Sequence, residues 1–280
     1  MKTLGLVWNS PRPSLEAVVM QAISSSKAAE APSMLEATNL SVVRSGKLVL
    51  EDVNLSINKG EFVGIVGPNG GGKSTLLLTV LGILQPAHGS VTVFGHNPQN
   101  VNFNGNVGWV SQSAASIPTK MRMTVRELIS LGTLSTSNLF SFRRRKNDEA
   151  VERALELVGL TDLAEMDIAR LSGGMRQRAV IGRALASNAE LLIFDEPLVN
   201  VDRSSRNGIL KLLDDLCHNE NKTLLMVSHD LTAIRQSAHR VIYLDGQIQY
   251  DGKPSAIPDL SGLAGLIGLQ HVHADSHMEE

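Results

Sequence analysis

The 280-residue sequence has one cysteine, few aromatic residues and no dominant sign of charge. A single thiol excludes an internal disulfide, which agrees with a reducing compartment. The 26 basic and 28 acidic residues leave a net charge of −2, so we expect no nucleic-acid partner. No run approaches the roughly 20 apolar residues that cross a bilayer, so any membrane role is expected to come from a partner protein.

With 42% hydrophobic residues, the chain can bury one large core or two modest ones. The single cysteine, Cys217, follows a helical stripe that includes Ile209, Leu213 and Leu216. The sequence around it lacks the electropositive setting of a reactive thiolate. We therefore predict that Cys217 is structural.

The two ends differ in composition from the rest of the chain. Residues 1–33 contain prolines and a Ser/Ala-rich stretch, which predicts a disordered extension, and Met34 is an alternative start. Residues 34–257 carry the patterned segments, and residues 258–280 form a Gly-rich and then His-containing tail that we expect to be flexible.

Apolar runs and helical periodicity alternate along the patterned region, which predicts a parallel α/β core. Antiparallel strands are expected on its N-terminal side, and a helical insertion at about residues 113–170. Strands are predicted at 35–43, 47–57, 61–66, 90–95, 107–112, 191–195 and 223–228. Helices are predicted at 73–84, 124–132, 148–160 and 206–219, and a further helix is predicted to follow the second glycine turn and end at about Ala186. A hairpin is predicted at 240–252.

A glycine-rich loop, GPNGGGKST, follows the strand EFVGIV and fits the pattern G-x-x-x-x-G-K-[ST] in full. Its glycines let backbone N–H groups turn inward toward phosphate oxygens. Lys73 brings a positive charge to the β- and γ-phosphates, and Ser74 offers a hydroxyl to Mg²⁺. The predicted nucleotide-binding residues of this loop are Gly67, Pro68, Asn69, Gly70, Gly71, Gly72, Lys73, Ser74 and Thr75.

Two acids emerge from the apolar run LLIFDEP, which suits a buried parallel strand. Asp195 lies at its carboxyl end, where α/β folds bind ligands, and is predicted to hold Mg²⁺. Glu196 would then face an attacking water. TLLMVSHD repeats this design and ends near His229. By itself that histidine is more often structural than a contact to the γ-phosphate.

The ordered set GPNGGGKST, Gln112 in WVSQ, LSGGMRQR, LLIFDEP, Asp202 in NVD and His229 in VSHD resembles the ATP-binding subunit of an ABC transporter. The resemblance covers about residues 35–252. It implies an α/β P-loop NTPase core of the ABC type, with an antiparallel β subdomain and an inserted helical subdomain. It also implies ATP and Mg²⁺ as cofactors, ATPase activity and a homodimer.

In that family the signature turn of one subunit caps the ATP of the other, so Ser172, Gly173 and Gly174 would contact the partner's nucleotide. The resemblance further implies that Glu196 is the catalytic base and that His229 steadies the γ-phosphate. Gln112 would sense Mg²⁺ and water while linking to the helical insertion, and Asp202 stands at the D-loop position, among the nucleotide-binding residues. The implied location is the cytoplasmic face of the cell membrane, bound to an integral membrane permease that receives cargo from an external substrate-binding protein.

Three positions depart from the family pattern. Arg44 stands near the place of an aromatic residue that usually stacks on adenine, and a guanidinium plane is able to stack there instead. Met175 replaces a glutamine of the signature, which would weaken the contact to the partner's nucleotide. Gly71 replaces a common alanine, which we expect to be harmless.

The cargo is less specifically indicated. KMRMTVRELISLG, DEPLVNVD and the basic segment around Arg143 to Lys146 are similar to manganese, zinc and iron importers. Two alternatives stay open: an ABC ATPase for another cargo or a soluble process, and a regulatory module that binds nucleotide without turnover, suggested by Arg44 and Met175. The basic run itself is more simply a solvated loop.

The C-terminal tail has metal-ligand residue types at alternate positions. A metal-sensing tail is one hypothesis, and a flexible polar terminus is the simpler one. The residues concerned are His271, His273, Asp275 and His277.

Overall fold

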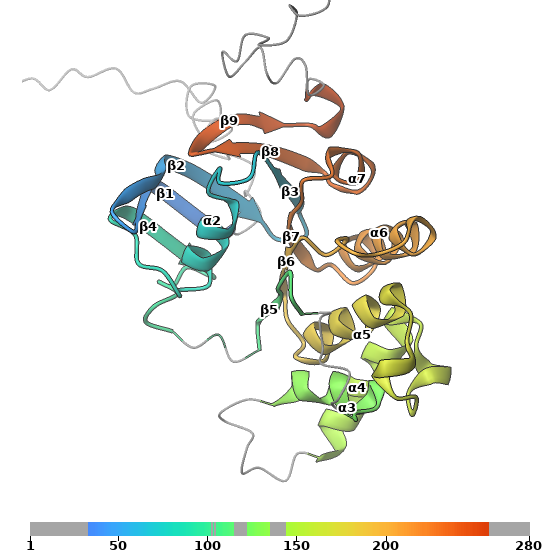
Figure 1. The fold of residues 1–280 in the computed structure, drawn as a ribbon. Helices are drawn as coiled ribbons and strands as arrows, with labels where there is room; N and C mark the ends of the chain where they lie inside the picture. The colour runs from blue at the N-terminus through green and yellow to red at the C-terminus, as the bar shows by residue number, and fades with distance from the viewer. Residues whose placement is uncertain (1–32, 102, 104, 115–121, 135–143, 258–280) are drawn as a thin grey trace, which may run out of the picture. The chain divides into compact units, whose positions relative to one another are not determined.

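The computed structural model describes residues 33–101, 103, 105–114, 122–134 and 144–257. Its strands form a three-stranded and a six-stranded sheet (Figure 1). The predicted extension, apart from Ser33, and the predicted C-terminal tail lie outside the described residues.

The six-stranded sheet has the order β5-β6-β7-β3-β8-β9 and carries the predicted parallel core. All neighbours are parallel except β8 and β9, which form the predicted hairpin around Gly246. The strands are β3 (Phe62–Val66), β5 (Val107–Val110), β6 (Leu191–Asp195), β7 (Thr223–Val227), β8 (Arg240–Asp245) and β9 (Gln247–Gly252).

The three-stranded sheet is antiparallel, with β1 (Ser33–Arg44) between β2 (Lys47–Asn58) and β4 (His88–Val93). Buried and exposed residues largely alternate along β1 and β2, as expected for a sheet with one face on a core. The predicted antiparallel N-terminal part is therefore confirmed.

Alternate residues of the central strands point to opposite faces and join two different cores. From β3, Val63 and Ile65 pack with the three-stranded sheet and α2 (Lys73–Val80), whereas Phe62 and Val66 pack on the side of the other helices. Continuous burial on both faces explains why β3 and β7 read as unbroken apolar runs.

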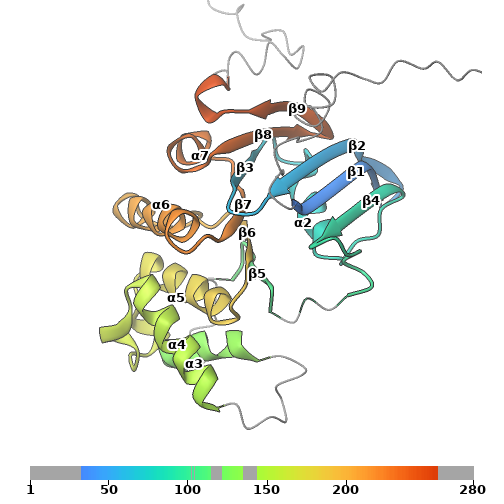
Figure 2. The same cartoon turned by 180° about the vertical axis from the view of Figure 1, so that it is seen from behind.

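Three helices lie on the face of the sheet opposite α2: α5 (Gly173–Ala186), α6 (Arg203–His218) and α7 (Leu231–Ser237) (Figures 1 and 2). The helix predicted from Arg206 begins earlier, because Asp202 accepts the Ser205 N–H and caps it. The helix predicted to continue to residue 84 ends at Val80, shortly before Gly82 with φ 73°. Periodicity did not predict α7, which spans only 7 residues.

The helical character predicted for residues 113–170 is confirmed in the described part. It contains α3 (Val125–Ser130) and α4 (Arg144–Val158), which pack on α5 through one apolar core. A capping box starts α3, since Thr124 Oγ1 accepts the Glu127 N–H at 3.1 Å and Glu127 accepts the Thr124 N–H at 2.8 Å. Short 3₁₀ turns complete the fold at Leu131–Thr133, Thr161–Leu163, Ile168–Arg170 and Pro254–Ala256.

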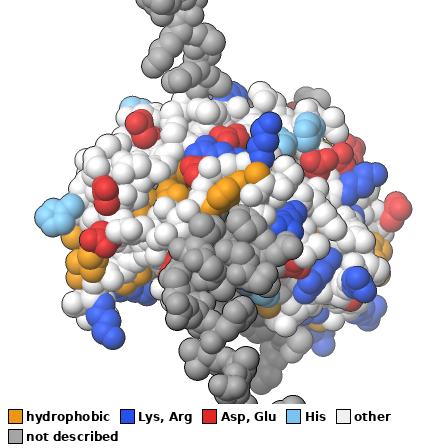
Figure 3. All heavy atoms as spheres, turned by 90° about the horizontal axis from the view of Figure 1, so that it is seen from above, with side chains coloured by type: hydrophobic (Ala, Val, Ile, Leu, Met, Phe, Trp, Pro, Cys, Tyr) orange, Lys and Arg blue, Asp and Glu red, His pale blue; other side chains and the backbone are white. Residues whose placement is uncertain are grey.

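On the face shown in Figure 3, acidic and basic side chains are interspersed rather than gathered by sign. Among the described residues, no helix is long and apolar enough to cross a membrane.

Candidate functional site

The glycine-rich loop connects β3 to α2, as its strand-loop-helix sequence predicts. Gly67 lies against the neighbouring strand β8, where an added Cβ would be 2.0 Å from the carbonyl oxygen of Leu244. At Gly72, with φ 92°, an added Cβ would be 2.4 Å from Leu50 Cδ2. Only glycine permits this close approach of the loop to its two neighbouring strands.

Lys73 is buried and folds back over the loop that precedes it. Its Nζ donates to the carbonyl oxygens of Gly67 at 2.9 Å and Pro68 at 2.8 Å. Burial lowers the pKa of Lys73, while the carboxylates of Glu196 and Asp195 act in the opposite direction. The ammonium group is thus held inside the loop, where incoming anionic oxygens would meet it.

A polar cleft of about 530 Å³ opens beside this lysine. It brings together segments from β1, the glycine-rich loop, the ends of β5 and β6, and the segment after β7. The residues that line it are Arg44, Asn69, Gly70, Gly72, Lys73, Ser74, Thr75, Gln112, Asp195, Glu196, Val199, Val227 and His229.

Asp195 is the last residue of β6 and lies in the cleft wall, as predicted. Burial raises the pKa of its carboxyl group, and the neighbouring charge of Glu196 adds to this, while Lys73 acts in the opposite direction. Burial and the second acid both disfavour the ionised form of Asp195 in the protein alone.

Glu196 and His229 form a pair at the ends of adjacent strands β6 and β7. Glu196 has φ 52°, an uncommon value outside glycine, and its N–H donates to Val227 O at 2.9 Å. Its Oε2 lies 2.8 Å from His229 Nδ1 and accepts the His229 backbone N–H at 3.3 Å. The Glu196 side chain is 14% exposed and that of His229 is 63% exposed, so the histidine faces the open side.

Two further predicted residues reach the cleft from other elements. Arg44 is the last residue of β1, and Gln112 follows the end of β5. Both are exposed, so each is accessible to a ligand in the cleft.

The remaining residues of the glycine-rich loop do not line the cleft, and their backbone carbonyl groups accept hydrogen bonds instead. Gly67 and Pro68 accept from Lys73, and Gly71 accepts the Gly246 N–H at 3.0 Å. A Cβ at Gly71 would be 2.9 Å from Leu244 O, so an alanine at this position requires a shift of the backbone.

The signature turn lies elsewhere, against the start of α6. Ser172 caps α5, its Oγ accepting the Met175 N–H at 3.3 Å. A Cβ at Gly173 would be 3.2 Å from Asn200 O, and one at Gly174 would be 2.3 Å from Ser205 Cβ. The turn is therefore packed against the segment that carries Asp202.

Asp202 is exposed and accepts two local hydrogen bonds. Its Oδ1 accepts the Ser204 hydroxyl at 2.6 Å and the Ser205 N–H at 2.9 Å, which holds the pKa of Asp202 well below its usual range. Neither Asp202 nor the residues Ser172, Gly173 and Gly174 are among the described residues that line the cleft. The predicted site residues thus separate into two surfaces of one chain.

Sequence reasoning missed several residues of the site. Asp245, at the end of β8, adds a third carboxylate near Lys73, and the same strand-end argument used for Asp195 could have identified it. Val199 and Val227 line the cleft as apolar residues and carry no motif that would indicate this.

Several known proteins are similar to this chain. A profile of the family described as ABC transporter matches residues 50–199. The zinc uptake system ATP-binding protein ZurA of Listeria innocua is 37% identical over 219 residues, covering 78% of this chain and 85% of that protein. The zinc uptake ATP-binding protein ZnuC of Bacillus subtilis is 39% identical over 197 residues, covering 70% and 84%.

Among solved structures, a dimeric ATP-binding cassette in a post-hydrolysis state with bound ADP and phosphate is similar to this chain. It is 28% identical with a TM-score of 0.65, and the match covers 80% of this chain and 100% of that one.

Proposed function

The chain belongs to the ABC transporter family, as an ATP-binding subunit that hydrolyses ATP, and from this we propose that it powers a membrane permease importing a divalent metal ion. The cargo proposal rests on the similarity to zinc uptake proteins. The single observation that carries the catalytic part is the cleft in which Lys73, Asp195 and Glu196 converge. Manganese, zinc and iron are the ions to test.

The nucleotide would bind with its phosphates wrapped by the loop from Gly67 to Thr75. Lys73 lies where it would neutralise the β- and γ-phosphates, and the N-terminal end of α2 adds its positive dipole. Arg44 would lie against the adenine, because it is a planar cation in the wall of the same cleft.

The donor set in the cleft suits Mg²⁺. Ser74, Gln112 and Asp195 supply a hydroxyl, an amide carbonyl and a carboxylate, all hard oxygen ligands, and all three line the cleft. When bound, Mg²⁺ would neutralise charge on the phosphate oxygens. Ser74, Gln112 and Asp195 are therefore proposed as its ligands, directly or through water.

In the hydrolysis step, Glu196 would take a proton from water as the water oxygen bonds to the γ-phosphorus. The bond to the bridging oxygen breaks with its electron pair, giving ADP and phosphate. His229 contacts Glu196 at 2.8 Å and is exposed toward the cleft, so it would hold the carboxylate in position and donate to the γ-phosphate.

A homodimer would complete each site. Ser172, Gly173, Gly174 and Asp202 lie outside the chain's own cleft, which favours their use on the nucleotide of a second copy. A turn with backbone N–H groups and a small hydroxyl suits an anionic phosphate. The similar solved cassette with ADP and phosphate is itself a dimer, which supports a dimeric arrangement.

The proposed placement follows from these partners: residues 34–257 form the ATPase domain at the cytoplasmic face of the membrane, with residues 113–170 as the part that contacts the permease. Residues 1–33 and 258–280 flank the domain. The permease would receive the ion from an external binding protein.

The test compares the wild-type complex with its permease against Glu196→Gln, with Glu36→Gln as the matched control on the exposed face of β1. We expect Glu196→Gln to lower turnover by about 10²–10⁴-fold and retain an ATP-dependent dimer, and Glu36→Gln to behave as wild type. If the wild-type complex binds ATP without turnover, the regulatory alternative suggested by Arg44 and Met175 replaces the proposal. Stimulation of ATPase by Mn²⁺, Zn²⁺ or Fe²⁺ with the binding protein identifies the cargo, and stimulation by none contradicts metal import.

A further inference from the structure

Three side chains with metal-ligand chemistry meet near the C-terminal end of α6, and none of them lines the nucleotide cleft. Asp214 and His218 are four residues apart on α6 and so share one face of the helix. His239 comes from the residue just before β8. One ligand atom from each lies within 4.8 Å of the other two.

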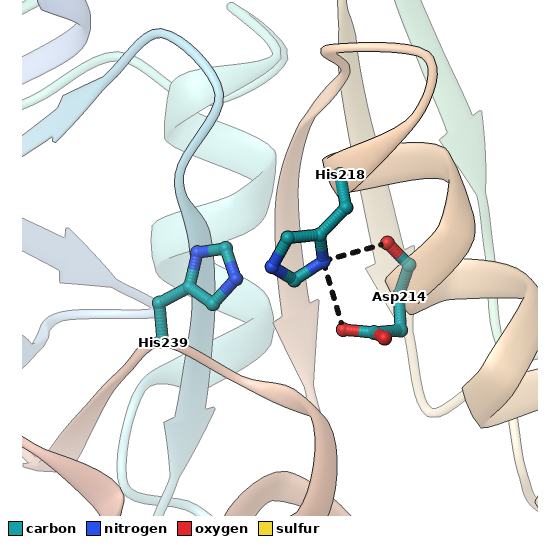
Figure 4. Close-up of side chains that lie close together, drawn as sticks. All are labelled: Asp214, His218 and His239. Carbon is teal, nitrogen blue, oxygen red and sulfur yellow. Dashed lines mark hydrogen bonds and ion pairs between the residues drawn. The ribbon is translucent and has the colours of Figure 1, made fainter.

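The hydrogen bonds of His218 leave one of its nitrogens available. Its Nδ1 lies 3.1 Å from Asp214 Oδ1 and 3.1 Å from the Asp214 carbonyl oxygen, so Nδ1 carries the proton. The other nitrogen, Nε2, keeps its lone pair and faces a ring nitrogen of His239 (Figure 4). A carboxylate that orients a histidine in this way is typical of metal-ligating histidines.

The two imidazole rings are 4.9 Å apart between centroids, with an angle of 75° between their planes. On His239, Nδ1 accepts the backbone N–H of Phe62 at 3.3 Å, which leaves Nε2 for a ligand. In a neutral ring this arrangement places the proton on Nε2. An ion must therefore displace that proton or weaken the long bond to Phe62, so binding is expected to be modest and to strengthen as pH rises.

We propose that Asp214, His218 and His239 form a binding site for a divalent transition-metal ion of the Zn²⁺ class. Nε2 of His218 and Nε2 of His239 would be the protein ligands, with water at the remaining positions, and Asp214 would orient His218 through Nδ1 rather than bind the ion itself. The side chains of His218 and Asp214 are 57% and 48% exposed, so the ion reaches them from solvent and they can adjust to it. A bound ion would link α6 to the start of β8 and stabilise the folded chain.

The neighbouring thiol does not belong to this site. Cys217 is buried and its Sγ donates to Gly60 O at 3.2 Å. Burial raises the pKa of Cys217 to about 11, so it remains a protonated thiol rather than a thiolate ligand.

The test uses the full-length chain in which His271, His273 and His277 are replaced by alanine, because the tail histidines would also bind zinc. Calorimetric titration with Zn²⁺ in nucleotide-free buffer is expected to give one saturable site per chain and a rise in Tm. His218→Ala should weaken this binding at least tenfold and abolish the rise in Tm. His88→Ala, an exposed histidine on β4, is the matched control and should bind as its parent does.

Asp214→Asn provides a second variant that keeps the side-chain size, and it should also weaken binding. Binding of Zn²⁺ should tighten between pH 6 and pH 8, and excess Mg²⁺ should not compete, because Mg²⁺ prefers oxygen ligands. Absence of saturable binding overturns the proposal. So does binding that survives both His218→Ala and Asp214→Asn, including binding that is lost instead on His229→Ala in the cleft.

Discussion

His229 Nδ1 lies 2.8 Å from Oε2 of Glu196, although the two residues are 33 positions apart and come from neighbouring strands. The same carboxylate oxygen accepts the His229 backbone N–H at 3.3 Å. Both the ring and the backbone N–H of His229 therefore hold the Glu196 carboxylate, and a change in either residue should alter the position of the other.

Coupling between these two residues is the first prediction. His229→Ala and Glu196→Gln should each lower kcat by about 10²–10⁴-fold, the range for loss of an acid-base group, with a much smaller effect on ATP affinity. Because they act as a unit, the double variant should be no slower than the slower single variant. Steady-state ATPase kinetics measure this, with His88→Ala as the control. Multiplicative losses in the double variant would show that the two residues act independently.

Asp195→Asn is expected to stabilise the nucleotide-free protein and remove its activity. Burial raises the folded-state pKa of Asp195, so the stability cost of its ionised form is fully present above that folded-state pKa and fades as the pH falls through it toward the lower pKa of the unfolded chain. At pH 7 the neutral amide should therefore increase the free energy of unfolding by about 0.5 kcal/mol, near the low end for such changes because the group is only half buried.

Thermal or urea unfolding at pH 7 and again near pH 4 checks the Asp195 prediction. The stabilisation should be larger at pH 7 than near pH 4, where the wild-type carboxyl group is closer to neutral. Equal effects at both pH values would assign the change to packing rather than to charge.

Gly67→Ala is expected to destabilise the fold as well as abolish nucleotide binding. The added Cβ would lie 2.0 Å from Leu244 O, so the loop or β8 must move. Gly95→Ala is the matched control, since Gly95 has φ 74° but open space around its Cβ position. The control should cost about 1 kcal/mol for backbone strain.

We expect the loss at Gly67 to exceed that of the control by about 1–3 kcal/mol, in the range for overpacking a buried position. Chemical denaturation of both variants without nucleotide gives the comparison. A Gly67→Ala protein as stable as Gly95→Ala would mean that the loop relaxes freely.

If each ATP site is formed by residues of two chains, two inactive variants should restore ATPase activity when they are mixed. Lys73→Ala chains and Ser172→Arg chains should each be inactive alone. When they are mixed, a hybrid dimer combines the intact loop of one chain with the intact signature turn of the other, so part of the ATPase activity should return. If both residues served the same chain's nucleotide, no hybrid would contain an intact site.

The control for complementation places both substitutions in one chain and mixes it with wild type. Hybrid dimers then have one defect in each site, so they should contribute no activity, and the total should follow the wild-type homodimers alone. Activity of such hybrids equal to that of the complementing pair would contradict sites shared between chains.

Local features of the chain could be predicted because local sequence decides them. The loop from Gly67 to Thr75 needs glycines where the backbone approaches other groups, and LLIFD is apolar because β6 is buried on both faces. Asp195 could be placed at a ligand-binding edge because a parallel strand ends there. The start of α6 was predicted three residues late, since the cap formed by Asp202 outweighs the weak apolar pattern of Arg203–Arg206.

Which of these segments contact one another is decided only by the tertiary structure. The order β5-β6-β7-β3-β8-β9 sets Glu196 beside His229 and brings Leu244 and Asp245 against the phosphate loop. It also brings His239 to His218. Periodicity reports which face of a strand is buried but not which strand is its neighbour, because several orders would bury the same apolar surface equally well. The sequence by itself determined the chemical groups at each strand end, and the packing of the strands determined which of those groups meet.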